Sequence, residues 1–274
     1  MKERSRDEMK KNHWILSLVL LTTGLMGVSS SVYAETKEAG EMGISFQGLI
    51  DPNYGIVDPE NPKSDLKLDG EYGHSTGPLR IDFVPSLSFS RNKIATDEVS
   101  YASDALVFKE MLACRGQFIQ VSDYREKQTG WSLQVRQETQ FTNQKKADSQ
   151  LDGAVLSFDN SWVNTRNGTS QPPDVSKEVI RLSNIGETYT LAKADKGTGG
   201  GTWSVSFGAS MDYEDATSTV KPRLDEQGKA IIDATNNNQA VFMNQAVRLT
   251  IPSGTKKEAG TYKTVLTWII SELP

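Results

Sequence analysis

The chain is built of short segments in which apolar and polar residues alternate, and glycine, proline, asparagine or aspartate separates each segment from the next. Alternation with a period of two places every second residue on one face of a β-strand. Beyond residue 77 we expect ten strands: Leu79–Val84, Phe118–Ser122, Trp131–Gln137, Leu151–Phe158, Val179–Leu182, Thr188–Leu191, Thr202–Phe207, Ala230–Ile232, Ala246–Ile251 and Thr261–Ser271. Many short strands broken by turn residues predict an all-β fold, an antiparallel β-sandwich or a barrel-like domain.

The last expected strand ends close to the final residue of the sequence. Tyr262, Thr264, Leu266, Trp268 and Ile270 have the same parity, so in a strand they project from one face. That face is aromatic and aliphatic, and we expect this strand to close the fold.

One segment has helical character instead. Ser103 or Asp104 can cap a helix in front of a run of apolar residues, which predicts one short helix over Ser103–Leu112. Cys114 follows this segment and is the only cysteine, which excludes an internal disulfide. We expect it to be a small buried apolar residue.

Residues 1–34 have the pattern of a secretory signal peptide. Lys10 and Lys11 precede a largely apolar run of fifteen residues, and the small-x-small site Val32-Tyr33-Ala34 follows. Fifteen helical residues span about 22 Å, less than the ~30 Å of a bilayer core. We therefore expect cleavage after Ala34 and a secreted, extracellular protein, and not an uncleaved anchor. Translation from Met9 would give a more compact signal.

Removal of this signal takes away five of the 30 basic and three of the 35 acidic residues, so the mature chain has 25 basic and 32 acidic residues and a net charge of −7. This charge gives no electrostatic basis for binding nucleic acid or an anionic membrane. Residues 35–77 hold one strand-like segment, Gly43–Ile50, and then a stretch rich in proline, glycine and acid that we interpret as an irregular surface arm. We expect residues 78–274 to form the β domain.

The sequence gives little support to a catalytic or metal site. His74 is the only histidine of the mature chain and lies in a glycine-flanked loop, so neither a His/Cys zinc site nor a Ser-His-Asp triad is expected. The glycines at 197–201 precede an alternating segment, which favours a turn over a phosphate loop. Acidic residues at 51–55 and 65–71 lack the spacing of a helical calcium loop, and no carboxylate pair indicates a glycosidase. We predict no enzyme activity, no cofactor and no metal.

The tryptophans are the sharpest candidates for a binding surface. Trp131, Trp162, Trp203 and Trp268 remain after signal cleavage. A buried tryptophan stabilises a core by several kcal/mol, whereas an exposed ring can stack on a sugar. We expect Trp203 to belong to the core, and both interpretations stay open for Trp131 and Trp268. Trp162 has asparagine and serine neighbours and is expected to be the most exposed ring.

Two of these tryptophans lie in motifs that resemble those of the WxL family of Gram-positive cell-surface proteins. The first motif is Gly130-Trp131-Ser132-Leu133, preceded by Asp123-Tyr124-Arg125. The second runs from Tyr262 through Leu266-Thr267-Trp268-Ile269-Ile270, with Pro274 six residues after the tryptophan. Val84–Phe89, Leu151–Leu156 and Gly199–Trp203 also fit, so the resemblance covers nearly the whole mature chain. Ile270 stands where leucine is usual, and because isoleucine favours strands we expect the same fold.

The resemblance implies non-covalent binding to cell-wall peptidoglycan through the C-terminal domain, with no sortase motif or lipid. A second implied partner is a membrane-anchored WxL-interacting surface protein. The alternative is a structural or adhesive subunit that docks on another surface protein and not on glycan. The residues expected to contact the wall or a partner are Trp131, Leu133, Tyr262, Leu266, Trp268 and Ile270 from the motifs, and Trp162 from its neighbours.

Overall fold

The computed structural model describes residues 55–67, 72–108, 114–168, 170–233 and 238–274. The predicted signal peptide and the strand expected at Gly43–Ile50 lie outside these residues. Within them all regular structure is β-strand and every strand pairing is antiparallel, which confirms the predicted fold class. The described sheets are open and none closes into a barrel. The same residues contain no helix with the length and apolar character of a membrane span.

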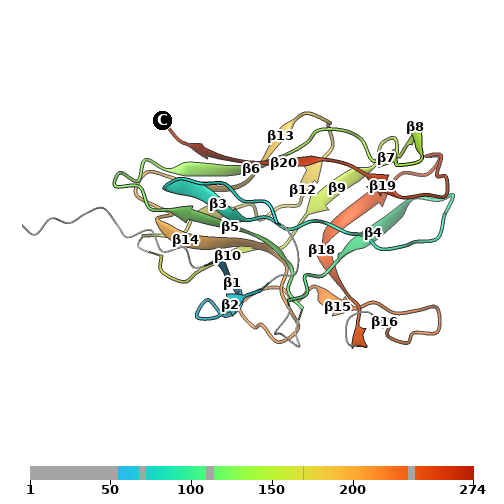
Figure 1. The fold of residues 1–274 in the computed structure, drawn as a ribbon, viewed down its shortest axis with the longest axis horizontal. Coiled ribbons are helices and arrows are strands. Elements are labelled where there is room, and N and C mark those ends of the chain that lie inside the picture. The colour runs from blue at the N-terminus through green and yellow to red at the C-terminus, as the bar shows by residue number, and fades with distance from the viewer. Residues whose placement is uncertain (1–54, 68–71, 109–113, 169, 234–237) are drawn as a thin grey trace, which may run out of the picture. The chain divides into compact units, whose positions relative to one another are not determined.

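One layer of the domain is a four-stranded sheet in the order β10-β14-β5-β3 (Figure 1). Its strands are Ser161–Thr165 (β10), Gly201–Phe207 (β14), Gln117–Asp123 (β5) and Leu79–Phe83 (β3). All seven residues of β5 and all seven of β14 are buried. Both faces of the central strands are therefore covered, and this burial explains why their apolar and polar side chains are equally hidden from solvent.

Two further sheets complete the main core. The first has the order β11-β13-β6-β20, with Asp174–Val175 (β11), Thr188–Ala194 (β13), Trp131–Gln137 (β6) and Leu266–Glu272 (β20). The second has the order β12-β9-β18-β15, with Ile180–Leu182 (β12), Val155–Phe158 (β9), Phe242–Ile251 (β18) and Val220–Pro222 (β15), and β4 (Val99–Asp104) also pairs with β18. The largest apolar cluster takes buried residues from all three sheets, so they enclose one sandwich-like core.

Three small sheets lie around this core. They are β1 (Ile56–Val57) with β2 (Asp65–Leu66), β16 (Ile232–Asp233) with β17 (Gln239–Ala240), and β19 (Tyr262–Lys263) with β7 (Thr142–Asn143) and β8 (Lys146–Gln150). The C-terminal segment, expected to be one strand from Thr261 to Ser271, is thus two strands. β19 pairs with β7 and β20 pairs with β6, and the change of partner falls at residues 264 and 265.

The helix predicted over Ser103–Leu112 is wrong for the residues described. Ser103 and Asp104 end strand β4, where Ser103 lies opposite Asn244 of β18. Leu106 then exchanges two backbone hydrogen bonds of 2.9 Å with Arg115, in an isolated antiparallel bridge. Tertiary pairing with β18 therefore overrides the helical appearance of this sequence; residues 109–113 lie outside the described residues. Cys114 is free and buried, as predicted.

Residues 55–67 of the N-terminal arm are partly buried and do not form the surface loop that their composition suggests, whereas residues 72–77 are exposed. Ile56, Val57 and Leu66 are buried, and the carboxylate of Asp58 is held by Arg115, with oxygen-to-nitrogen distances of 2.8 and 2.9 Å. The Arg115 guanidinium also lies 3.2 Å from Glu60. Because Asp58 and Arg115 are 1% and 7% exposed, this ion pair is inside the domain. Residues 55–67 therefore pack on the face of the β5 sheet that points away from the main core.

Candidate functional site

The two tryptophan motifs lie side by side on adjacent strands. β6 carries the first motif and β20 the second, and in their antiparallel register Leu133 lies opposite Ile270 while Val135 lies opposite Trp268. Directly opposed residues of an antiparallel pair point to the same face, which here is the face toward the main core. Motifs 137 residues apart in the sequence thus form one continuous apolar surface.

The first motif is entirely inside the protein. Trp131 and Leu133 have no exposed surface, because β6 is a central strand with β13 on one side and β20 on the other. The Trp131 indole Nε1 donates a hydrogen bond of 3.1 Å to the carbonyl oxygen of Gly199. A Cβ atom at Gly199 would lie 2.8 Å from that nitrogen and 2.4 Å from the side chain of Ala194. The glycine turn before β14 therefore packs closely against the indole. It is a turn, as predicted, and not a phosphate loop.

The second motif is only half-buried, because β20 is the edge strand of its sheet. Leu266, Trp268 and Ile270 pack on the main core from this edge. The Trp268 ring meets the Phe158 ring edge-on, with centroids 6.1 Å apart and an interplanar angle of 75°. Part of the Trp268 side chain thus remains at the surface.

Tyr262, the first residue of the second motif, is held by its hydroxyl group. The hydroxyl accepts a hydrogen bond of 3.0 Å from the Glu258 backbone N–H and donates one of 3.1 Å to the Glu258 carbonyl. The Ser149 hydroxyl lies 3.0 Å away. Hydrogen bonds from Lys146 and Lys256 lower the pKa of Glu258 to about 2, so this carboxylate is charged at neutral pH. Tyr262 therefore fixes the bend 257–262 that leads into β19.

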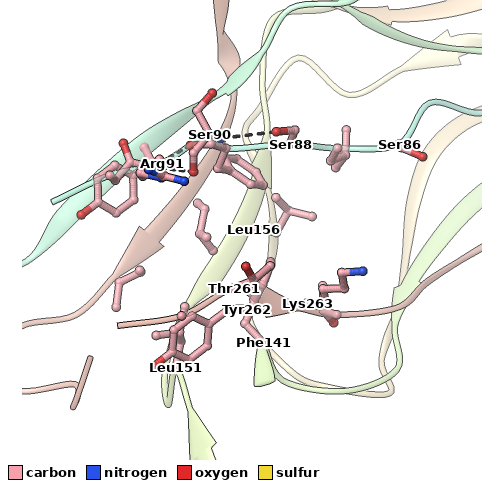
Figure 2. Close-up of a pocket in the computed structure, with 18 of the residues that line it drawn as sticks. Ser86, Ser88, Ser90, Arg91, Phe141, Leu151, Leu156, Thr261, Tyr262 and Lys263 are labelled. Atoms are coloured by element: carbon pink, nitrogen blue, oxygen red, sulfur yellow. Dashed lines mark hydrogen bonds between the residues drawn. The ribbon is translucent and has the colours of Figure 1, made fainter. Parts of the chain in front are cut away.

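A groove of about 1370 Å³ opens beside this bend and the start of β20. One wall is the segment between β3 and β4, residues 84–94, and the other is residues 257–266 (Figure 2). Trp268 is also a lining residue. Phe141, Leu151, Leu156, Leu249 and Ile251 line it between these walls. An apolar depression with hydroxyl groups on its walls has the form of a ligand site. We call it the C-terminal groove.

The charge of the C-terminal groove is opposite to that of the whole chain. Arg91, Lys93, Lys257 and Lys263 line it, and Glu258 is its single acidic residue. Lys93 forms an ion pair with Glu226, which lies outside the groove. Arg91 and Lys263 are exposed and form no ion pair with any described residue. The groove is therefore locally cationic in an acidic protein.

Trp162 lies away from this groove, on the edge strand β10. Its ring is half-buried and stacks on Tyr213, with centroids 4.8 Å apart and an interplanar angle of 28°. Its Nε1 donates to the Gly208 carbonyl at 2.9 Å. The structure thus does not bring Trp162 together with the other predicted contact residues. Trp203 is 4% exposed, in agreement with its predicted place in the core.

The remaining candidates stay apart from one another. His74 is exposed, and its Nδ1 lies 3.4 Å from the Tyr72 carbonyl oxygen. Burial raises the pKa of the Cys114 thiol to about 11, so the thiolate form is suppressed at neutral pH. Asp65 pairs with Arg166 at 2.6 Å. Within the described ranges no group of three or more His, Cys, Asp or Glu residues is placed to hold a metal ion.

Sequence reasoning missed the wall of the groove formed by residues 84–94. Leu87 and Phe89 are half-buried against the main core, while Ser86, Ser88 and Ser90 between them are exposed. This alternation continues beyond the expected strand Leu79–Val84 and was the available signal. The segment belongs to no sheet, but it is tied to the end of β4. The Asp104 N–H donates to the Ser88 carbonyl at 2.7 Å, and the Ser88 and Ser90 hydroxyl groups each donate to the Asp104 carboxylate at 2.6 Å.

The fold and the paired motifs together define a β-sandwich surface domain with an open groove at its C-terminal strand. A family model described as a WxL domain, surface cell wall-binding, matches residues 33–274. The chain belongs to this WxL family, whose domain binds the cell wall at the cell surface. No curated protein and no solved structure matches the chain.

Proposed function

We propose that the chain is exported with removal of residues 1–34 and binds peptidoglycan non-covalently in the C-terminal groove. The observation that carries this proposal is the position of the groove. It lies directly against the second WxL motif, with Tyr262, Leu266 and Trp268 among its lining residues. The family is a wall-binding one, and this groove is the large depression beside the residues that define it.

The chemistry of the groove also supports binding and not catalysis. Its lining combines aromatic rings with hydroxyl groups, for example Phe89 and Tyr101 with Ser86 and Thr261. Rings stack on sugar or peptide surfaces, and hydroxyl groups exchange hydrogen bonds with them. Its one carboxylate, Glu258, is neutralised by two lysines, with Nζ-to-oxygen distances of 2.6 and 2.9 Å. The single carboxyl group of the groove therefore has a lowered pKa, and not the raised pKa of a carboxylic general acid.

In this proposal Trp131 and Leu133 act from the core and not by touching the wall. Both are fully buried, and they hold β6 against which β20 is registered. Leu266 and Trp268 contact the ligand from the groove, while Ile270 packs behind them. The first motif contributes to binding by holding the strand of the second motif in position.

Sedimentation with purified, protein-free wall sacculi tests the proposal. The mature chain, residues 35–274, should pellet with the sacculi, and Ser86→Trp should abolish pelleting because the new ring fills the groove. Ser86 is exposed and its side chain makes no hydrogen bond to a described residue, so the fold should survive. Ser183→Trp is the matched control, an exposed serine outside the groove. Equal pelleting of both variants would show that the wall binds elsewhere.

Export is tested separately, by the N-terminus of secreted material. Mass spectrometry should find Glu35 as the first residue, in agreement with a family match that begins at residue 33. An intact apolar segment on the extracellular protein would contradict cleavage.

An exposed apolar patch favours a second candidate function, docking on a membrane-anchored WxL-interacting surface protein. Leu224 and Ile232 are 54% and 49% exposed, and the antiparallel Leu224–Ala230 bridge places them on the same face of the hairpin that it closes. Exposed apolar patches mark interaction sites. Ile232→Ser should weaken co-purification with such a partner and leave pelleting with protein-free sacculi unchanged. If the wall alone retains the protein and no partner depends on Ile232, this second function is absent.

A further inference from the structure

The free edge of β20 presents backbone groups of the second WxL motif itself. Glu138 N–H donates to the Val265 carbonyl and Leu273 N–H donates to the Gly130 carbonyl, at 2.9 and 3.1 Å. In an antiparallel pair the backbone groups of alternate residues point to the partner strand. The odd-numbered residues of β20 therefore bond to β6, and Leu266, Trp268 and Ile270 direct their N–H and C=O groups away from it.

No described residue pairs with these outward groups. Among the described strands β20 hydrogen-bonds to β6 alone, although β3 lies close to it, and the register between Leu266 and Glu272 is continuous, without a bulge. Lysine, proline or a bulge usually protects such an edge, but β20 carries none along its seven residues and has one acid, Glu272, at its end. An unprotected edge next to a groove is the geometry for adding an extended peptide as a strand.

The C-terminal groove lies on this edge. Of the three outward positions, Leu266 and Trp268 line it and Ile270 does not, so the groove follows the first half of β20. On the opposite wall, Arg91 forms no ion pair with a described residue, and the same holds for Lys263 at the near wall (Figure 2). A peptide placed along β20 would thus have cations on both sides for its carboxylates.

We propose that the groove recognises the peptide part of the wall polymer, a short extended peptide with free carboxylates, by strand addition to β20. This inference rests on the proposed function, because it names which component of peptidoglycan the same groove binds. Backbone pairing requires a peptide, and neither a sugar chain nor a polyol phosphate offers alternating N–H and C=O groups. The carboxylates of the peptide pair with Arg91 and Lys263.

Competition for the protein bound to sacculi tests the inference. The sacculi are first freed of phosphate-containing polymers by hydrofluoric acid, and two soluble competitors are compared: the peptides released by an amidase and the glycan strands left behind. The mature chain should stay bound to the treated sacculi, the peptides should displace it, and the glycan strands should not. Displacement by the glycan strands, or loss of binding after the acid treatment, would overturn the inference and leave wall binding intact. Failure to bind untreated sacculi contradicts the proposed function itself.

Charge substitutions give an independent readout. The double variant Arg91→Gln with Lys263→Gln should bind the sacculi about tenfold more weakly and with less dependence on salt, because rim cations no longer meet the carboxylates. Lys177→Gln is the control, an exposed lysine outside the groove. All three substitutions are at exposed positions, so thermal unfolding should be unchanged. If the double variant binds as tightly as Lys177→Gln, carboxylate recognition at these two residues is excluded.

Discussion

The two WxL motifs have similar sequences, with leucine in the first where the second has isoleucine, and they lie at different positions in the fold: one on a central strand and one on an edge strand. Trp131 and Leu133 lie on a central strand, where neighbours on both sides leave them no exposed surface. Trp268 and Ile270 lie on the adjacent edge strand and are half-buried. One motif therefore acts as core, and the other is available for contact. A tryptophan motif is not by itself a binding motif, since the place of its strand in the sheet decides what it can touch.

The largest expected effect is the difference in unfolding free energy between alanine substitutions at the two tryptophans. Trp131→Ala should cost about 3–5 kcal/mol of unfolding free energy, because it empties a fully enclosed site. Trp268→Ala should cost about half as much, since part of its ring is already in water. Urea unfolding of residues 35–274 measures both. Equal losses would end the distinction between a core motif and an edge motif.

A finer comparison replaces each ring by phenylalanine. Trp131→Phe removes the donor to the Gly199 carbonyl and leaves that acceptor buried, at a cost of about 1–3 kcal/mol. Trp268→Phe removes a ring whose nitrogen bonds to no described residue, and should cost less than about 1.5 kcal/mol. Thermal unfolding gives the stabilities and sacculus pelleting gives the function. If Trp268→Phe stays folded and loses wall binding, this ring contacts the ligand directly.

The pair Leu133 and Ile270 offers a smaller test with opposed residues. Ile270→Leu, which restores the residue usual in the family, should change stability by less than about 1.5 kcal/mol, because the edge site can adjust to a new branch. Leu133→Ile makes the reverse change in the enclosed neighbour and should cost more. A larger loss at Ile270 would indicate that the edge is as tightly packed as the centre.

The smallest expected effect is a pH dependence at the end of β20. A hydrogen bond from Thr129 and the charge of Arg125 lower the pKa of Glu272. Because the folded pKa is depressed, the contact stabilises the protein above the ordinary glutamate pKa of 4.5, and this stability is lost as the pH falls through the folded pKa. The midpoint temperature of thermal unfolding should fall slightly less between pH 7 and pH 3 for Glu272→Gln than for the unmodified protein. Identical pH profiles for Glu272→Gln and the unmodified protein would show that this contact does not stabilise the fold in solution.

The sequence predicted the strands that are determined by their own alternation of apolar and polar residues. β6 and β14 lie where Trp131–Gln137 and Thr202–Phe207 were expected, because a buried face and turn residues determine such strands directly. The C-terminal alternation continues through residues 264 and 265, so the change of partner from β7 to β6 has no local signal. The false helix at Ser103–Leu112 has the same cause, since β18 determines the structure there.

The candidate site could be predicted only in part. The family motifs identified Leu266 and Trp268, which line the groove, together with Trp131, which is enclosed. Alternation places all three residues on the apolar face of their strands, and it contains no information on which strand is central and which is at an edge. Residues 84–94, with their cations, come close to the second motif only in the folded chain. The sequence alone therefore does not indicate that they line the same groove.

The buried pairing of Asp58 with Arg115 bears on how this domain could serve as a portable wall anchor for other proteins. A fusion that began at residue 78 would lack Asp58 and Glu60, the two carboxylates that pair with the Arg115 guanidinium. Breaking a buried pair in this way costs about 3–5 kcal/mol, a large part of the stability of an ordinary domain. A cargo protein should therefore be joined upstream of Ile56, so that the anchor keeps the carboxylates that neutralise its interior.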